Sequence, residues 1–374
     1  MLFLVTEDWY FVSHRLGLAR AARAAGWRVV VAARESEHAE TIRASGAEFV
    51  ALPFERALTY PWRDLRLLWS LRGLFAAVRP DVLHLVSLKP ILLGGLALPW
   101  AGPRCAPLLA FTGLGYVFSS GSGLARLLRP LVLALLARIA RRPRAWVLAQ
   151  NADDLALLQA RGIGQASRAS IIGGAGVDPA DYPASPLPPR AGAIVLLPAR
   201  VLRDKGVEEF VAAAALLRAR HPDVRCVIAG AHDRDNPGAV GADQLARWVA
   251  SGAIEWWGAR RDMAAVYRQA YIVCLPSWRE GLPRALLEAA AAARPLVATD
   301  VPGCREICID GNTGLSVPPR DPPALAAALA RLLEDEALAR RCAAGAHARL
   351  HAHFTLESVA RRTLDLYAEL RAAP

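Results

Sequence analysis

Short apolar runs alternate with longer amphipathic stretches along the first half of the chain. The short runs are bounded by glycine, proline or charged residues and favour buried strands, whereas the longer stretches repeat their apolar positions at the helical period. Strands are predicted over residues 2–5, 28–33, 48–52, 81–85, 106–111, 145–149 and 170–173. Helices are predicted over residues 14–25, 38–45, 63–77, 91–100, 124–140 and 152–161. This alternation predicts an α/β domain built on a doubly wound parallel sheet.

A second alternating series follows a stretch that is rich in proline and glycine, residues 179–192. Its strands are predicted over residues 193–197, 225–229, 254–257, 271–275, 295–298 and 314–317. Its helices are predicted over residues 206–220, 243–251, 263–270, 284–293 and 323–334, with a last helix over 356–370. Because proline and glycine mark linkers, we place one Rossmann-like domain at residues 1–185 and another at 186–355. Residues 356–374 are expected to form a C-terminal helix that packs back toward the first domain.

Two glutamates flank the start of a predicted helix in the second domain. Glu280 follows the strand predicted over 271–275, and Glu288 lies on the first turns of the helix that begins near Pro283. The carboxyl ends of parallel strands and the amino ends of the following helices are where such sheets bind ligands. Two carboxylates with free backbone N–H groups between them can recognise hydroxyl and phosphate groups. A capped surface helix with two solvated glutamates is the alternative explanation of this stretch.

Two cations follow the first strand of the same domain. Arg200 and Lys205 precede the predicted helix that begins at Gly206. A guanidinium can hold two oxygens at once and an ammonium adds a point charge, so the pair suits a diphosphate. Taken alone, the two residues also fit ordinary surface charge.

Several classes of site are disfavoured by what the sequence lacks. Neither domain has G-x-G-x-x-G after its first strand, which argues against a nicotinamide or flavin cofactor. The sequence also lacks G-x-x-x-x-G-K-[ST], which argues against an ATPase. Cys304 and Cys308 lie four positions apart without a second Cys or His pair, so a zinc site is not expected. We expect neither a cofactor nor a metal. The six scattered cysteines are typical of reduced core residues and indicate a cytoplasmic protein.

The net charge of +11 is concentrated in the first half of the chain. Residues 1–190 hold 22 Lys and Arg against 13 Asp and Glu, whereas the remainder holds 23 against 21. This asymmetry suggests an anionic partner, either nucleic acid or an anionic membrane surface. No aromatic and basic array supports nucleic acid, so no nucleic-acid partner is expected.

One predicted helix of the first half combines leucines with arginines. Its apolar face would be formed by Leu124, Leu127, Leu128, Leu131, Leu135 and Ile139. Its border would be formed by Arg126, Arg129, Arg138, Arg141, Arg142 and Arg144. This composition suits a helix lying on an anionic bilayer, although any buried helix shows a similar leucine stripe.

Taken together, the motifs resemble those of retaining glycosyltransferases of family 4, which have the two-domain GT-B fold. The matching features are Arg200 and Lys205 with Gly206, the strand end at Gly230, an E-x7-E signature at Glu280 and Glu288, Gly303-x-x-Glu306-Ile307, and Asp310-Gly311-Asn312-x-Gly314. The resemblance covers essentially the whole chain, because residues 174–178 match the segment that closes the first domain. It implies two Rossmann-like domains that face each other across a cleft.

The resemblance also implies roles on the donor side. Arg200 and Lys205 would hold the donor's diphosphate and stabilise the leaving nucleotide, and Glu280 would lie beside the donor sugar. Glu288 would accept hydrogen bonds from the ribose hydroxyls. The remaining donor-side residues would be Gly281 and Leu282, through their N–H groups, and Glu306. We expect Glu280, Arg200 and Lys205 to be the catalytic residues, because fixed cations aimed at a leaving diphosphate stabilise it most.

The acceptor side is expected in the first domain, where residues 7–15, 84–90 and 111–116 each follow a strand. These segments look like those of the bacterial subgroup that extends polyprenyl-diphosphate-linked sugars in surface polysaccharide, O-antigen or glycan assembly. The candidate acceptor contacts are Asp8, His14, Arg15, His84 and Lys89. Structural capping or a core histidine is the alternative for each. The chain departs from many members in having Glu7-Asp8 in place of a glycine pair and Thr112-Gly113 in place of a histidine.

The predicted function is therefore retaining transfer of a hexose or N-acetylhexosamine from a nucleoside-diphosphate sugar, with UDP as the expected nucleotide. The acceptor would be a polyprenyl-diphosphate-linked saccharide or polysaccharide, and the protein would sit peripherally on the inner face of the cytoplasmic membrane. Retention is expected by a front-side route in which the donor phosphate takes the acceptor proton, unlike the paired carboxylates of glycoside hydrolases. Two alternatives are a non-hydrolysing sugar-nucleotide 2-epimerase of the same fold and a non-catalytic protein that binds sugar nucleotides or membranes.

Overall fold

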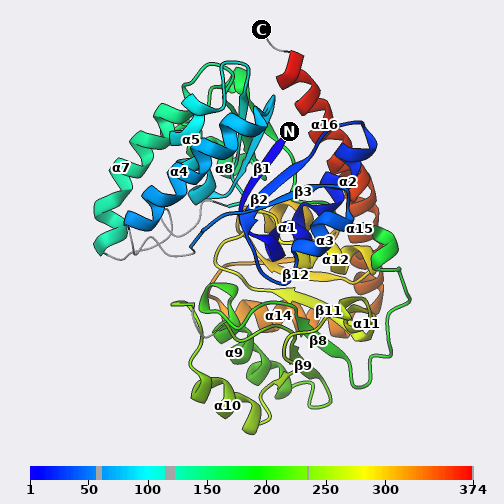
Figure 1. The fold of residues 1–374 in the computed structure, drawn as a ribbon. Coiled ribbons are helices and arrows are strands. Elements are labelled where there is room, and N and C mark those ends of the chain that lie inside the picture. Colours follow the sequence, from blue (N-terminus) through cyan, green and yellow to red (C-terminus); the bar gives the residue numbers. More distant parts are fainter. Residues whose placement is uncertain (56–60, 114–122, 234–235, 373–374) are drawn as a thin grey trace. The chain divides into compact units, whose positions relative to one another are not determined.

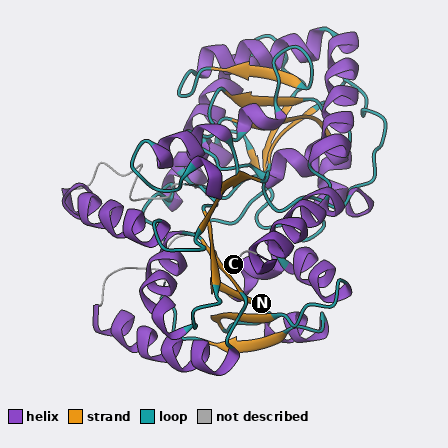
Figure 2. Cartoon of the chain, turned by 90° about the horizontal axis from the view of Figure 1, so that it is seen from above, coloured by secondary structure: helices purple, strands orange, loops and turns teal. Residues whose placement is uncertain are grey.

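The computed structural model describes residues 1–55, 61–113, 123–233 and 236–372. The chain divides into two units, one formed by Met1–Ala175 with Leu356–Pro374 and the other by Gly176–Thr355. Each unit contains one parallel sheet with helices on both faces (Figures 1 and 2). The division at Ala175 and Gly176 comes before the proline-rich stretch that the sequence suggested as the linker.

The proline-rich stretch lies in the second unit because a buried arginine binds it there. The Arg294 guanidinium donates to the carbonyl oxygens of Ser185 and Pro186, and also to that of Ala270 at 3.1 Å. Arg294 is fully buried, and this burial lowers its pKa to about 10. Leu187 packs against the core of the same unit. The stretch is thus a folded part of the second unit.

The first unit holds seven parallel strands in the order β3-β2-β1-β4-β5-β6-β7. The strands are β1 (Leu2–Glu7), β2 (Val30–Arg34), β3 (Glu48–Ala51), β4 (Val82–Val86), β5 (Ala106–Ala110), β6 (Trp146–Ala149) and β7 (Ala169–Ile171). In β1, Leu2 and Leu4 face one hydrophobic core, whereas Phe3 and Val5 face the other. Because both faces of the sheet are covered, its central strands read as continuous apolar runs instead of alternating ones.

Two layers of helices cover this sheet. One layer consists of α4 (Pro61–Val78), α5 (Leu88–Ala97), α7 (Gly123–Ala140) and α8 (Ala152–Gln159), with the short 3₁₀ helix η1 (Leu98–Trp100) after α5. The other consists of α1 (Asp8–His14), α2 (Leu16–Ala24), α3 (Ala39–Ala44) and α16 (Leu356–Ala372). The last helix of the chain therefore completes the first unit: α16 packs on α2, and a Cβ at Gly17 would come within 2.6 Å of Leu356.

The second unit holds six parallel strands in the order β10-β9-β8-β11-β12-β13. They are β8 (Ile194–Leu197), β9 (Arg225–Ile228), β10 (Glu255–Trp256), β11 (Ala270–Leu275), β12 (Leu296–Thr299) and β13 (Gly314–Val317). Its helices are α9 (Val207–Arg218), α10 (Ala242–Ala250), α11 (Met263–Gln269), α12 (Arg284–Ala291), α13 (Cys304–Ile307), α14 (Pro322–Glu334) and α15 (Glu336–His353). The remaining 3₁₀ turns of the chain are η2 (Ala166–Arg168), η3 (Pro179–Asp181) and η4 (Arg203–Lys205).

Among the described residues, three helices were not expected from the sequence: α1, α13 and α15. The chain forms α1 directly after β1, so the predicted helix over 14–25 is the separate helix α2. α15 is rich in alanine and arginine, which gives its buried positions little contrast with its exposed ones. Asp335 marks its start, because the Asp335 side chain accepts a hydrogen bond from the N–H of Leu338 at 2.8 Å.

The six cysteines are free and buried. Burial raises the pKa of Cys226 and of Cys308 to about 12, so neither thiol is a thiolate at neutral pH. Within the described ranges, no helix has both the length and the apolarity needed to cross a bilayer.

Candidate active site

The donor-side candidates meet where the strand order of the second sheet reverses. The chain leaves β8 toward β9 and β10 on one side, then returns to β11 and continues through β12 and β13 on the other. The loops after β8 and β11 therefore diverge, and such a switch point is where open α/β sheets bind ligands. Arg200 and Lys205 follow β8, and Glu280 follows β11.

Lys205 and Glu280 form an ion pair that joins these two loops. Lys205 Nζ lies 2.7 Å from Glu280 Oε1, which also accepts from Ser277 Oγ at 2.7 Å. Burial lowers the pKa of Lys205, but the charge and the hydrogen bond of Glu280, together with the charge of Asp204, outweigh it, so the pKa is raised. The positive charge of Arg200 partly opposes the rise in the pKa of Lys205. The Arg200 guanidinium forms an ion pair with Asp233 at 2.9 Å. The structure thus pairs two of the three predicted catalytic residues, Lys205 and Glu280, and holds Arg200 on Asp233 within electrostatic range of Lys205.

Glycines at the strand ends let these loops touch through their backbones. A Cβ at Gly206 would lie 2.0 Å from the carbonyl oxygen of Pro276, and Gly206 has a φ of 70°. A Cβ at Gly230 would lie 1.8 Å from the carbonyl oxygen of Ala199. A Cβ at Gly303 would lie 2.3 Å from that of Gly281. Since only glycine tolerates such approaches, these motif positions fix the spacing of the loops that carry the cations and Glu280.

Glu288 belongs to a second polar cluster on α12. Its Oε1 accepts from Arg284 Nε at 2.7 Å, and its Oε2 accepts from the Tyr267 hydroxyl at 3.0 Å. Burial, together with the neighbouring Glu288, raises the pKa of Tyr267 well above its ordinary value, so Tyr267 stays a donor. Tyr182 lies beside the Glu288 carboxylate. Its pKa is raised mainly by burial and next by the charge of Glu288. The carboxylate of Glu288 is therefore held in one orientation.

The remaining donor-side candidates, Gly281, Leu282 and Glu306, lie on the segment after Glu280 and on α13. Leu282 is buried in the core of the second unit, and Gly281 lies against Gly303, which precedes α13. Glu306 lies on α13, and its carbonyl oxygen accepts from Arg349 Nε at 2.6 Å. The donor roles of these residues stay predictions.

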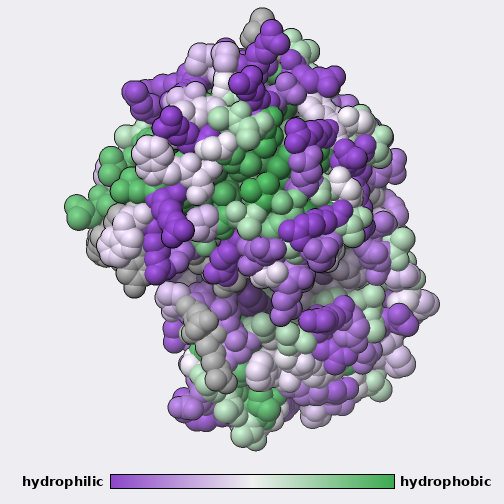
Figure 3. All heavy atoms as spheres, in the orientation of Figure 1, coloured by the Kyte–Doolittle hydropathy of each residue, from purple (hydrophilic) through white to green (hydrophobic). Residues whose placement is uncertain are grey.

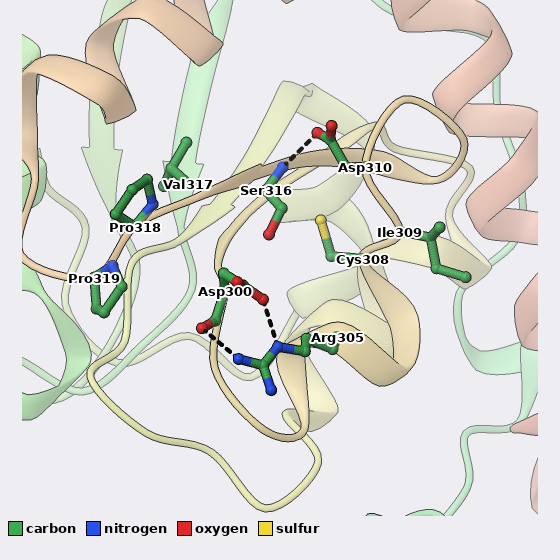
Figure 4. Close-up of a pocket in the computed structure, with 9 residues that line it drawn as sticks. All are labelled: Asp300, Arg305, Cys308, Ile309, Asp310, Ser316, Val317, Pro318 and Pro319. Atoms are coloured by element: carbon green, nitrogen blue, oxygen red, sulfur yellow. Dashed lines mark hydrogen bonds and ion pairs between the residues drawn. The ribbon is translucent and has the colours of Figure 1, made fainter.

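A hollow of about 520 Å³ lies in the second unit beside the ends of β12 and β13 (Figure 4). It is lined by Asp300, Arg305, Cys308, Ile309, Asp310, Ser316, Val317, Pro318 and Pro319, so neither Lys205 nor Glu280 contributes to it. Asp300 pairs with Arg305, and Asp310 Oδ1 accepts from the N–H of Ser316 at 3.0 Å. Asp310 thus stabilises the turn that enters β13, and the hollow is a structural feature separate from the switch point.

In the first unit, Asp8 is fully buried at the start of α1. Its carboxylate accepts from the N–H groups of Trp9 and Ser36 at 2.6 Å, from the N–H of His38 at 3.2 Å and from the Ser36 hydroxyl. Burial alone would raise its pKa, but the hydrogen bonds from Ser36 and the two other N–H groups lower it. Asp8 therefore joins β1 to the segment after β2, and any contact with an acceptor stays a prediction.

His84 and Arg15 are also buried, and they lie near each other. His84 Nδ1 lies 2.5 Å from the hydroxyl of Tyr367 on α16, and its Nε2 has no hydrogen-bond partner. Burial, followed by the charge of Arg15, lowers the pKa of His84 well below its usual range, so the ring is neutral. Arg15 donates to the carbonyl oxygen of Gly174 at 3.3 Å.

The last two acceptor candidates are engaged with neighbouring side chains. The His14 ring stacks on Tyr10 at 4.4 Å between centroids, and its Nδ1 lies 2.7 Å from Ser13 Oγ. Lys89 Nζ pairs with Asp64 at 2.8 Å. Residues 114–116 of the predicted acceptor segment lie outside the described residues.

Several partners of the site were not identified from the sequence. Arg284 lies four residues before Glu288 on one helix, and this i,i+4 spacing could have identified it. Tyr267 and Tyr367 gave no comparable signal, because they reach Glu288 and His84 from distant elements. Among the residues that the structure describes, no three His, Cys, Asp or Glu side chains are grouped as metal ligands.

Two family models match the chain. The model described as "Glycosyl transferase 4-like domain" matches residues 12–174, and "Glycosyl transferases group 1" matches residues 192–335. The phosphatidyl-myo-inositol mannosyltransferase of Mycolicibacterium smegmatis is 30% identical over 357 residues, which is 91% of this chain and 85% of that protein. The chain belongs to the family 4 glycosyltransferases.

Solved structures agree with a GT-B fold for this glycosyltransferase. Sucrose-phosphate synthase from Thermosynechococcus elongatus superposes with a TM-score of 0.83 and 23% identity, covering 100% of this chain and 99% of that one. Other relatives align over less of their length. The N,N'-diacetylbacillosaminyl-diphospho-undecaprenol alpha-1,3-N-acetylgalactosaminyltransferase of Campylobacter jejuni is 33% identical over 174 residues, 46% of this chain and 44% of that protein. The glycosyltransferase spans about half the length of several relatives that it matches.

Proposed function

We propose that this glycosyltransferase moves a hexose or N-acetylhexosamine from a UDP-sugar to a lipid-linked saccharide, with retention at the anomeric carbon. The observation that carries the proposal is the 2.7 Å ion pair of Lys205 and Glu280 beside Arg200 at the switch point of the second sheet. Cations fixed there can meet a donor diphosphate, and Glu280 can meet the sugar that the diphosphate carries.

The two cations would act mainly on the leaving group. The nucleoside diphosphate gains negative charge as its bond to the sugar breaks, and preorganised positive groups stabilise that charge most effectively. Lys205 is protonated at neutral pH, because its pKa is raised above the ordinary lysine value of 10.5. Arg200 would exchange Asp233 for phosphate oxygens, which suits its half-exposed position. In the front-side route, the same diphosphate accepts the proton of the attacking hydroxyl. No metal is required in this scheme.

Glu288 would bind the ribose of the donor. A carboxylate has about four lone-pair directions, and Arg284 and Tyr267 each occupy one on different oxygens. With Tyr182 as a further donor beside the same carboxylate, Glu288 still keeps capacity for a ribose hydroxyl. Arg284 and Tyr267 would orient the carboxylate for this contact.

The acceptor would bind the first unit. Two relatives support a lipid-linked acceptor by their names, the phosphatidyl-myo-inositol mannosyltransferase and the diphospho-undecaprenol N-acetylgalactosaminyltransferase. Lys89 and His14 are partly exposed and could contact the acceptor directly, with Lys89 near its diphosphate. Asp8, His84 and the nearly buried Arg15 would act indirectly, by holding the loops around it. Such an acceptor would place the enzyme peripherally on the inner face of the cytoplasmic membrane.

A donor screen tests the proposal. The purified chain would be incubated with UDP-, GDP- and dTDP-sugars and a polyprenyl-diphosphate-linked saccharide, and release of nucleoside diphosphate would be followed. We expect acceptor-dependent release from a UDP-sugar that persists in EDTA, and a product with the donor's anomeric configuration by NMR. Interconversion of the donor without transfer would instead indicate the epimerase alternative, and inversion at the anomeric carbon would reject retention.

A further inference from the structure

Large apolar side chains are exposed together on one helical layer of the first unit. Of the twelve such exposed side chains among the described residues, eight belong to α4, α5, η1 and α7. They are Trp62, Leu65, Trp69, Leu96, Trp100, Leu127, Leu128 and Leu131. We refer to these eight residues as the α4–α7 face. Monomeric proteins rarely expose large apolar side chains contiguously without using them for binding.

The helix α4 is apolar on two sides. Leu67, Leu71 and Phe75 are fully buried in the core, whereas Trp62 and Trp69 are 64% and 69% exposed. A helix that borders a core and water normally carries polar residues on its outer side. The outer side of α4 instead combines exposed tryptophan and leucine with exposed arginines.

The leucine stripe predicted on α7 divides into two parts. Leu127 and Leu131 are 76% and 67% exposed, whereas Leu135 is partly buried and Ile139 is fully buried in the core of the first unit. The predicted stripe, which included Ile139, is therefore not one continuous exposed face. The side chains of Leu124 and Arg126 lie outside the described residues. The amino-terminal half of α7 is the part that offers leucines to a partner.

The residues of the α4–α7 face are structurally connected. α5 packs against both α4 and α7, and Figure 1 shows the three helices together on one side of the first sheet. The Arg72 guanidinium lies 5.4 Å from the Trp69 ring centroid and 5.9 Å from that of Trp100, which links α4 to η1. Figure 3 shows hydrophobic atoms gathered at the edge where α7 lies.

The charges around the face favour an anionic partner. α4 carries Arg63, Arg66 and Arg72 against one acid, Asp64; Asp64 is paired with Lys89, and Arg63 is paired with Glu55. α7 carries three arginines and no acidic residue. A second copy of the chain would bring like charges together. Tryptophans beside arginines are the composition of the interfacial zone of bilayers, where indole rings sit at the level of the headgroups and arginines meet anionic lipid.

We propose that the α4–α7 face docks the first unit on an anionic bilayer, with Trp62, Trp69 and Leu131 entering the interfacial zone. The inference deepens the proposed function and rests on it, because a lipid-linked acceptor lies in that bilayer. Arg66 and Arg138, both exposed, supply charge attraction beside the apolar contacts. This arrangement uses two helices, so neither α4 nor α7 alone holds the protein on the membrane.

Vesicle sedimentation of the full chain tests the proposal, using phosphatidylcholine vesicles with and without phosphatidylglycerol. We expect binding only to the anionic vesicles, weakened by added salt. The variants Trp69→Ser and Leu131→Ser should each weaken it about tenfold. The matched control Leu216→Ser, an exposed leucine on α9 of the second unit, should bind as the wild type does. Arg66→Gln with Arg138→Gln should reduce the salt dependence, whereas Arg161→Gln with Arg168→Gln should not.

The outcomes of these experiments separate the docking proposal from a self-association of the chain and from the proposed function. Absence of wild-type binding at low salt, or equal binding by Trp69→Ser, Leu131→Ser and wild type, would overturn the docking proposal. A self-association of the wild type that the same variants abolish, without lipid binding, would also overturn it in favour of a second copy. Donor turnover with a short-chain, water-soluble acceptor is measured in parallel. If that turnover is absent while vesicle binding follows the expectation, the proposed function fails and the docking surface stands.

Discussion

Lys205 and Glu280 lie 75 positions apart in sequence, and their side chains meet at 2.7 Å between the loops that follow β8 and β11. The contact has little solvent around it, with the side chains 22% and 12% exposed. The same Glu280 oxygen accepts from Ser277, so one atom fixes the end of β11 to the turn before α9. Lys205 and Glu280, which are proposed for catalysis, therefore also fix the positions of their two loops relative to each other.

Replacing either partner should abolish most transfer. We expect Lys205→Gln and Glu280→Gln each to lower kcat by about 100-fold or more, because a fixed charge at the reacting bond is lost. Turnover is measured by nucleoside diphosphate release, with circular dichroism to check folding. The matched control is Arg203→Gln in the same 3₁₀ turn, whose 3.4 Å pair with Glu208 is half-exposed. It should change kcat by less than about twofold. Equal losses in control and test variants would indicate a general loop effect.

Two glycines with nearly the same backbone conformation should respond very differently to alanine. Gly206 and Gly192 have φ values of 70° and 68°, but a Cβ at Gly192 meets nothing within 4 Å. Gly192→Ala should cost only the left-handed strain, about 1–2 kcal/mol. Gly206→Ala adds the clash with Pro276 and should cost at least about 3 kcal/mol in urea unfolding. Similar losses of unfolding free energy for both variants would mean that the loops after β8 and β11 can separate with little loss of stability.

The first unit should lose stability in acid because of Asp8. Hydrogen bonds lower its pKa below the ordinary 3.8, so its stabilisation is complete above that value and is lost as the pH falls through the lowered pKa. Asp8→Asn should reduce the free energy of unfolding by about 2 kcal/mol at neutral pH. The difference between wild type and variant should shrink below the ordinary pKa. A difference that stays constant with pH would show that the lost contacts are not charge-dependent.

Removing the Tyr267 hydroxyl should test whether Glu288 is oriented for the donor. Tyr267→Phe removes one hydrogen bond to Glu288 and leaves the carboxylate with Arg284 and the adjoining Tyr182. We expect KM for the UDP-sugar to rise about fivefold to tenfold with little change in kcat, since one hydrogen bond to a charged group is lost. Initial rates measured over a range of UDP-sugar concentrations separate the change in KM from the change in kcat. Tyr271→Phe is the control, because the Tyr271 hydroxyl is buried without a hydrogen-bond partner. A fall in kcat at unchanged KM would contradict a ribose-binding role.

Most strands and their alternation with helices could be predicted, because the apolar runs of the strands are short and are bounded by glycine, proline or charged residues. The donor-side residues could also be placed, since Arg200 and Glu280 each follow a strand directly and parallel strands end at one edge. The glycine motif gains its physical reason only from the structure, where Gly206 and Gly303 face backbone carbonyl oxygens.

The rest depended on contacts between distant segments. The boundary at Ala175 could not be inferred from composition, because a buried Arg294 binds the proline-rich stretch to the second unit. Nothing around His84 indicated that its ring would meet Tyr367. The outer side of α4 was not recognised either, because tryptophan and leucine at helical spacing look the same whether they face a core or a membrane.

The position of α16 has a consequence for how the chain is made. The first unit needs this helix, since Tyr367 is fully buried beside His84 and Val359, Leu366 and Leu370 lie in its core. During synthesis, residues 1–175 leave the ribosome long before α16 exists, so the sheet face that α1, α2 and α3 cover lacks its fourth helix while the entire second unit is translated. The second unit is continuous in sequence and can close first. We therefore expect the order of folding to be the reverse of the order of synthesis.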